Sequence, residues 1–246
     1  MYRTTLAAAA LALVAGTTHA QVTFEPIAND FIGLDLSADG NAMAGNDAWN
    51  YDAFRWTRTG GIEHFTDRST TAVFGSGAGT PDISYDGTRI SATVMDATGT
   101  FITPGLWVEG TGWIDVFPPL LPDGGSIDNA YGSCWSMSGD GLTVGGFYWR
   151  PGNQSGLAHG LNWTQAGGPV SLSAPGEKSS RINAISYDGA VSVGWEEAPF
   201  GTWQPHVWRG GVDYQLKSPR AGSWPTTSTT TAASSSGRPP PARRST

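Results

Sequence analysis

The sequence predicts an all-β repeat protein of the β-propeller type, and three observations lead to this. Its 246 residues include 34 glycines and 11 tryptophans, while only 14% of the residues carry a charge. Many glycines and aromatics with few charges favour short strands and tight turns over helices. A Ser-x-Asp-Gly pattern recurs four times, and a tryptophan-containing segment follows each copy. No amphipathic helix is predicted after residue 20.

The first half of the repeat is an apolar residue, then Ser-x-Asp-Gly, then a short apolar segment that ends near glycine. The four pairs are Asp39-Gly40, Asp86-Gly87, Asp140-Gly141 and Asp188-Gly189. Successive aspartates are 47, 54 and 48 residues apart. Asp-Gly between two apolar runs predicts a hairpin turn, because glycine accepts positive φ and aspartate tolerates it. We expect these aspartates to serve the turns, because each lacks the further oxygen ligands of a calcium loop.

The second half of the repeat is a tryptophan segment, a glycine-rich turn and another apolar segment. The tryptophans are Trp56, Trp107, Trp163 and Trp208. Each copy therefore predicts four short strands in roughly 50 residues, the size of a propeller blade. One such sheet cannot bury both faces alone, so copies must stack, with the tryptophan filling space between neighbours. A β-solenoid is the alternative, although its usual repeat is shorter.

The chain is expected to divide into three segments. These are a signal peptide at 1–20, a β-repeat domain at 21–216 and a tail at 217–246. We place the repeats at about 30–70, 78–120, 130–174 and 180–216. Four copies are few for a propeller, so an incomplete ring is an open alternative.

The N-terminus has the layout of a secretory signal peptide. Arg3 supplies a positive charge, residues 6–16 form an apolar run, and Thr18-His19-Ala20 offers small residues at the cleavage positions. The apolar run is shorter than the roughly 20 residues that span a bilayer. We expect cleavage after Ala20, export to the periplasm or the cell exterior, and no membrane span in the mature chain.

The tail differs in composition from the rest of the chain. Residues 217–246 contain no Leu, Ile, Val, Phe, Asp or Glu and consist mainly of Ser, Thr, Pro, Ala, Gly and Arg. This composition predicts a disordered segment. Out-of-frame translation is the alternative, and the chain would then be a truncated, non-functional fragment of a longer repeat protein.

One repeat carries a family resemblance. The segment Ala53-Phe54-Arg55-Trp56-Thr57-x-x-Gly60-Gly61, following Ser37-x-Asp39-Gly40 and Gly45, resembles the HAF repeat of bacterial extracellular proteins. The His-Ala-Phe triplet of that family is incomplete in every copy: the first has only Ala53-Phe54, and the fourth has His206 without Ala-Phe. The resemblance covers about residues 30–216. It implies secretion and a propeller-like fold, and it implies no defined activity.

Charge and motifs restrict the possible functions. Residues 21–216 hold 21 acidic and 8 basic side chains, a net charge of −13, which disfavours nucleic acid as a partner. His64, His159 and His206 are far apart, and neither a His-Glu-x-x-His nor a Gly-x-Ser-x-Gly motif is present. Cys134 is the single cysteine and is expected to be a small buried hydrophobic residue. We predict no catalytic residue, no cofactor and no metal, so an enzyme is disfavoured.

Four further tryptophans are the candidate binding residues. Trp49, Trp149, Trp195 and Trp203 all fall between an Asp-Gly turn and the next repeat tryptophan. If the repeats superpose, these indoles share one edge of the array, where they would stack on sugars or hold a peptide. Packing between blades is the alternative. The predicted function is a binding or surface-interaction module for a glycan or protein at the cell surface, with an extracellular polysaccharide hydrolase or lyase as the other alternative.

Overall fold

The computed structural model confirms the predicted all-β repeat class. It describes residues 26–70, 79–116, 132–149, 157–172, 178–198 and 201–216. These residues form four sheets, each of four antiparallel strands in sequential order. The predicted signal peptide at 1–20 and the predicted tail at 217–246 lie outside the described residues.

The four sheets follow one another along the chain. The first consists of β1 (Phe31–Leu36), β2 (Ala42–Asp47), β3 (Ala53–Thr57) and β4 (Gly61–His64). The second consists of β5 (Asp82–Ile83), β6 (Arg89–Met95), β7 (Ile102–Val108) and β8 (Gly112–Asp115). The third consists of β9 (Gly132–Met137), β10 (Thr143–Trp149), β11 (Ala158–Thr164) and β12 (Gly168–Ser171). The fourth consists of β13 (Ser180–Ile185), β14 (Val191–Glu197), β15 (Trp203–Arg209) and β16 (Val212–Gln215).

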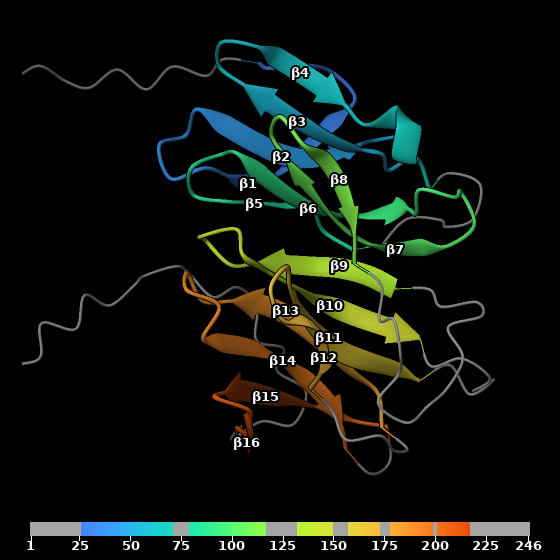
Figure 1. The fold of residues 1–246 in the computed structure, drawn as a ribbon, viewed down its shortest axis with the longest axis vertical. Helices are drawn as coiled ribbons and strands as arrows, with labels where there is room; N and C mark the ends of the chain where they lie inside the picture. The colour runs from blue at the N-terminus through green and yellow to red at the C-terminus, as the bar shows by residue number, and fades with distance from the viewer. Residues whose placement is uncertain are drawn as a thin grey trace, which may run out of the picture.

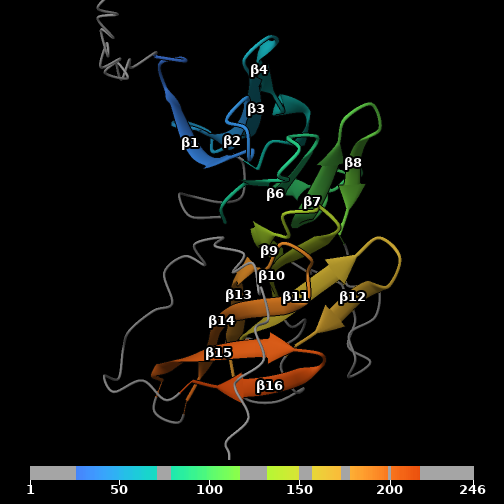
Figure 2. The same cartoon turned by 90° about the vertical axis from the view of Figure 1, so that its left-hand side faces the viewer.

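The sheets pack face to face in a curved stack, as in a propeller (Figures 1 and 2). The first strands of successive sheets contact one another, so β1, β5, β9 and β13 form the inner side of the stack. The stack does not close into a ring, in agreement with the incomplete-ring alternative. A single 3-10 turn, η1 (Thr66–Arg68), is the only helical element in the described ranges, and none of their segments is a helix that could cross a membrane.

Each Ser-x-Asp-Gly segment begins a five-residue connection between the first and second strands, which its own side chains close. In the third sheet the Ser138 hydroxyl donates to Asp140 at 2.6 Å and accepts the Thr143 N–H at 2.9 Å. Asp140 also accepts the Leu142 N–H at 3.0 Å. The same three bonds occur in all four sheets. Only the glycine takes positive φ, so the connection is not the two-residue turn that Asp-Gly usually forms.

The turns also link one sheet to the next. The Ala38 N–H donates to the Tyr85 carbonyl at 2.9 Å, and the Tyr85 N–H donates to the Gly139 carbonyl at 2.8 Å. The Asp140 N–H donates to the Tyr187 carbonyl at 2.9 Å. These bonds align the turns along the inner side. The rings of Tyr85 and Tyr187 meet with centroids 5.0 Å apart beside Gly139, where any Cβ would overlap the Tyr187 ring.

The glycine in the middle of the second strand of the repeat has a structural cause. The inner strand bulges opposite Gly45, Gly146 and Gly194, and a Cβ on any of these would overlap a carbonyl oxygen of that strand. A bulge bends the strand locally and brings its backbone close. The second sheet has Ala92 at this position, and there β5 pairs with β6 only through Asp82 and Ile83, with no partner opposite Ala92.

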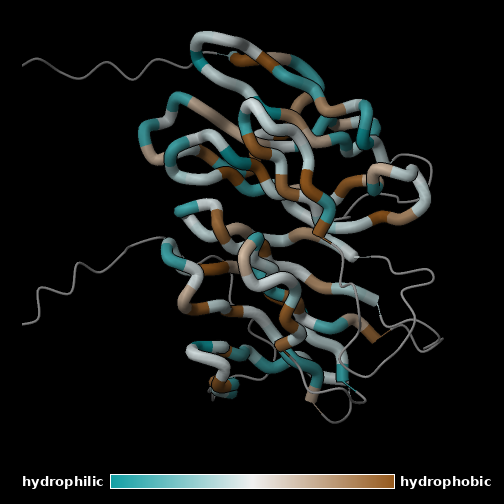
Figure 3. Tube along the Cα trace, viewed as in Figure 1, coloured by the Kyte–Doolittle hydropathy of each residue, from teal (hydrophilic) through white to brown (hydrophobic). Residues whose placement is uncertain are grey.

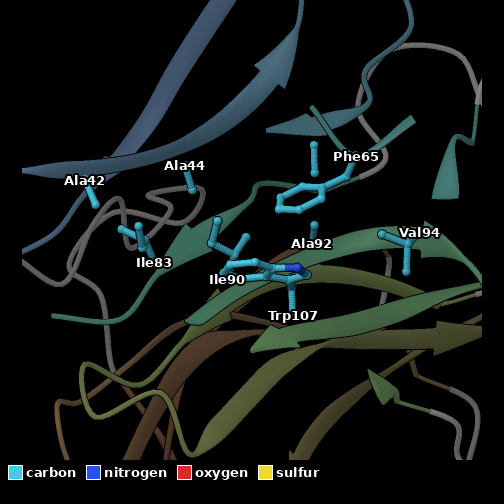
Figure 4. Packing of buried hydrophobic residues seen from close by; sticks show 9 residues of the cluster. Ala42, Ala44, Phe65, Ile83, Ile90, Ala92, Val94 and Trp107 are labelled. Carbon is cyan, nitrogen blue, oxygen red and sulfur yellow. The ribbon is translucent and has the colours of Figure 1, made fainter. Parts of the chain in front are cut away.

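The hydrophobic core lies between the sheets. Between the first and second sheets, Phe65 packs on Trp107 at 5.2 Å between centroids, above Ile83 and Ile90 (Figure 4). Each buried side chain of this size contributes about 1.5–3 kcal/mol. Corresponding clusters lie between the second and third sheets, where Cys134 is buried as expected, and between the third and fourth. Hydrophobic and hydrophilic segments accordingly alternate through every sheet (Figure 3).

One apolar face is not covered by a neighbouring sheet. We call the side of a sheet that faces its predecessor its front face. Leu36 of the first sheet occupies the position of Ile83, Met137 and Ile185 in the others. Leu36 is 55% exposed, whereas the three equivalents are at most 5% exposed. The front face of the first sheet therefore has the composition of a buried interface without its partner.

Candidate functional site

All four candidate tryptophans lie toward the end of the sheets where the second strand connects to the third. Trp49 lies in the β2–β3 connection and is 75% exposed. Trp149 ends β10 and contacts Phe147, edge to face. Trp195 lies within β14 and is buried, whereas Trp203 begins β15 and is 43% exposed. The four therefore share an end but belong to three different sheets.

Trp195 and Trp203 form a stacked pair in the fourth sheet. Their ring centroids are 4.8 Å apart and their planes are 29° from parallel. On β13, the Arg181 guanidinium lies 5.7 Å from the Trp195 ring and 3.6 Å from the ring of Trp135 on β9. The order Trp203–Trp195–Arg181–Trp135 is thus a ladder of flat groups from the outer part of the fourth sheet to the inner strand of the third. We call it the aromatic ladder.

Arg181 holds the ladder together. Its Nε donates to the Asn183 side chain at 3.2 Å. Burial lowers the pKa of Arg181 to about 10, so the guanidinium remains charged at neutral pH. A cation over an indole face is attracted by the ring quadrupole, and the attraction is stronger where water is excluded. The ladder is therefore a fixed platform that includes a partly exposed indole, Trp203.

Acidic side chains flank the ladder. Glu197 is the cross-strand partner of Trp203 and accepts the Ser179 N–H at 3.3 Å. Glu196 pairs with Lys178 at 3.2 Å between nitrogen and oxygen. An exposed indole beside carboxylates is a surface suited to a cationic or hydroxyl-rich ligand.

A second group of polar residues lies at the corresponding end of the first sheet. Asp47 ends β2, Asp52 directly precedes β3, and His64 ends β4. The His64 Nε2 lies 2.9 Å from Asp47 Oδ2 and 4.0 Å from Asp52 Oδ2. Both aspartates are buried. Three side chains that are not adjacent in sequence thus converge because their strand ends are neighbours.

The pKa values of the two aspartates move in opposite directions. Burial raises the pKa of Asp52, and the neighbouring Asp47 carboxylate raises it further. Burial also opposes ionisation of Asp47, but the N–H groups of Asn50 and Trp49 and the His64 ring outweigh it and lower its pKa. A carboxylate held ionised beside one that resists ionisation is an arrangement typical of functional sites.

A third group lies within the fourth sheet. His206 Nδ1 is 2.6 Å from Asp213 Oδ1, and one ligand atom each of Glu196, His206 and Asp213 lie within 4.8 Å of one another. His206 is buried against the ring of Trp208. Here Lys178 pairs with Glu196, so this group has a positive side chain beside it that the group in the first sheet lacks.

Two inner-strand carboxyl groups lie against each other. Asp35 on β1 accepts the Ile83 N–H at 2.9 Å, and Asp82 on β5 accepts the Met137 N–H at 2.8 Å. Burial and the Asp35 carboxyl raise the pKa of Asp82 well above its usual range. Each carboxyl bonds the backbone of the following sheet, so the pair links sheets and does not face a substrate cleft.

The repeat positions lie away from these groups. Asp39, Gly40, Asp86, Gly87, Asp140, Gly141, Asp188 and Gly189 form the turns at the opposite end of the sheets. Trp107, Trp163 and Trp208 are buried between sheets, and Trp56 lies on the uncovered front face of the first. None of these residues joins the aromatic ladder.

Sequence reasoning missed Trp135 and Arg181 because neither lies in the tryptophan segments that were compared between repeats. It also missed Asp47 and Asp52, whose contact with His64 depends on the pairing of β2, β3 and β4. A strand alignment would have placed these three side chains at one sheet end, since β2 and β4 flank β3.

The comparisons with known proteins concern the fold. No protein-family model matches the sequence, and no curated protein is similar to it. The fold is similar to a protein assigned as TolB in Agrobacterium tumefaciens, with TM-score 0.51 and 18% identity over 79% of this chain and 64% of that one. TolB from Acinetobacter baumannii is 14% identical with TM-score 0.45, over 76% and 43%. A puromycin-hydrolysing peptidase of Mycobacterium tuberculosis is 12% identical with TM-score 0.48, over 74% and 28%.

This chain therefore spans less than two thirds of the length of these structures. The likeness to the Agrobacterium protein, together with the four stacked sheets, supports a propeller-type fold.

Proposed function

We propose that this chain is an exported interaction module that binds a protein partner at the aromatic ladder. The observation that carries the proposal is Trp203, an indole fixed by stacking on Trp195 yet 43% exposed. Leaving a large aromatic face in water forgoes hydrophobic stabilisation unless a partner covers it. Trp and Arg are also the residue types that dominate binding energy at protein interfaces.

The charge around the ladder favours a basic partner segment. The β-repeat domain has a net charge of −13 between residues 21 and 216, and Glu197 is paired across the strands with Trp203. Lysine or arginine against the exposed part of the Trp203 indole would form a cation–π contact and meet carboxylates beside it. Complementary charge would also speed association at low salt.

A peptide-binding measurement tests this function. Fluorescein-labelled basic, neutral and acidic peptides, and soluble glycans, are titrated with the purified chain and followed by fluorescence anisotropy. We expect basic peptides that contain an aromatic residue to bind tightest, and Trp203→Ala to weaken them about tenfold, the usual scale of a central interface residue. Tyr214→Ala is the matched control, because Tyr214 is 50% exposed in the same sheet and is outside the ladder.

The result has clear alternatives. If acidic peptides bind as well as basic ones, or if Trp203→Ala has no effect, the proposed surface is wrong. If glycans bind and Trp203→Ala abolishes that binding, the ladder is a sugar platform and the partner class changes.

A further inference from the structure

The group formed by Asp47, Asp52 and His64 places two buried carboxyl groups beside one imidazole. In the residues that the structure describes, His64 is the only ion-pair partner of either carboxylate. When both carboxyl groups are ionised, even a protonated His64 would leave one negative charge among them. Burying charge without compensation is costly, so the arrangement favours an additional cation.

The hydrogen bonds leave specific atoms available. Asp47 Oδ1 accepts the N–H groups of Trp49 and Asn50, which fixes the carboxylate and leaves Oδ2 facing His64. Asp52 is 5% exposed; the Ser69 side chain and the Thr70 N–H donate to its carboxyl group, but its Oδ1 has no hydrogen-bond partner. A buried carboxylate oxygen without a partner is uncommon, because it loses its hydration and gains nothing in return. The missing hydrogen bond of Asp52 Oδ1 is independent of the close spacing of the three side chains, and it points to a ligand.

The spacing matches metal coordination. One ligand atom from each of the three residues lies within 4.8 Å of the others, and His64 Nε2 is 2.9 and 4.0 Å from the two facing oxygens. Zinc binds imidazole nitrogen and carboxylate oxygen at about 2.0–2.2 Å, so such ligands must be about 3–4 Å apart. Small rotations of the side chains therefore suffice to enclose an ion.

We propose that Asp47, Asp52 and His64 bind one divalent first-row transition-metal ion of the Zn²⁺ type. Two carboxylates and an imidazole suit Zn²⁺ or Mn²⁺, whereas Ca²⁺ requires about six to eight oxygens. The N–H bonds to Asp47 Oδ1 hold that ligand in place, as the outer-shell partners of metal ligands do. His64 is 29% exposed on its side chain, so a fourth position is open to water or to a group from a partner.

The group in the fourth sheet offers a matched comparison. Glu196, His206 and Asp213 are equally close, but Lys178 neutralises Glu196 there. A cation in that group would meet a positive side chain. The proposal therefore assigns the ion to the first sheet, and variants of the fourth-sheet group serve as controls.

The test is metal binding by the untagged full chain after treatment with a chelator. Isothermal titration with Zn²⁺, Mn²⁺ and Ca²⁺ should give one site for Zn²⁺, and Co²⁺ should give visible absorption of a four-coordinate site. Asp52→Asn and His64→Gln should each weaken Zn²⁺ at least tenfold, while His206→Gln leaves it unchanged. The melting temperature of each variant without metal shows that it is folded.

Three results would overturn the proposal: no Zn²⁺ binding by the wild-type chain, unchanged Zn²⁺ affinity in both His64→Gln and Asp52→Asn, or loss of binding in His206→Gln. His64→Gln is the more informative variant if Asp52→Asn does not fold, because His64 is partly exposed. The Trp203 peptide measurement is separate, so failure of one proposal leaves the other standing.

Discussion

Replacing Ser138 with alanine tests the turn network that recurs in every sheet. The substitution removes the 2.6 Å bond from the hydroxyl to the Asp140 carboxylate and leaves the buried Thr143 N–H without its acceptor. A bond to a charged group contributes about 1.5–3 kcal/mol, and an unsatisfied buried amide costs about 1–3 kcal/mol. Because the two losses share one hydroxyl, they are not additive, and we expect the free energy of unfolding to fall by about 3 kcal/mol.

Thermal unfolding followed by circular dichroism measures the effect. About 3 kcal/mol corresponds to roughly 6–12 °C in melting temperature for a domain of this size. Ser186→Ala is the matched control, because the same bonds exist in the fourth sheet but Ser186 is half-buried and its aspartate is exposed. Water can replace those bonds, so Ser186→Ala should shift the melting temperature by less than half as much. Equal shifts for the two variants would refute the argument that burial of the turn sets its energy.

Three other perturbations follow from the fold. The folded state raises the pKa of Asp82, so its contribution to stability is complete below its unfolded pKa of about 3.8 and is lost as pH rises through the folded pKa. The melting temperature of the wild-type chain should therefore fall between pH 4 and 8, and Asp82→Asn should remove this fall. An unchanged fall in the variant would contradict the reasoning. Gly146→Ala should prevent normal folding, because its Cβ would overlap the bulged inner strand, and a native-like melting curve would disprove this. Met137→Ala should lower the free energy of unfolding in urea by about 2–5 kcal/mol, because Met137 is buried. Leu36→Ala should lower it by less than about 1 kcal/mol, because Leu36 is exposed. Equal losses would show that the front face of the first sheet is covered in solution.

The fold class could be predicted because its determinants are local and repeated. Ser-x-Asp-Gly specifies its own turn through bonds within a few residues, and the repeat tryptophans mark the third strand of every sheet. The turn type differed from the usual Asp-Gly hairpin because Ser138 and its equivalents bond across the connection, which a two-residue loop would not allow.

The candidate sites were less predictable because they depend on contacts between strands distant in sequence. Trp195 was grouped with Trp203 by its place in the repeat, but alternation along β14 and the approach of Arg181 decide that it is buried and supporting. Asp52 and His64 are separated by a strand and a turn, so only the register of the first sheet places them near each other.

The uncovered front face has a consequence for the order in which the structure opens. The second and third sheets are each held on both sides, whereas the first and fourth are each held on one, and stacked repeats depend on their nearest neighbours. Amide hydrogen exchange should therefore be fastest in the end sheets and slowest in the central pair. The metal group lies on the first sheet, and the exposed part of the aromatic ladder, Trp203, lies on the fourth. Occupying either one would therefore shift a local opening equilibrium, and ligand affinity would be coupled to how completely that end of the stack is folded.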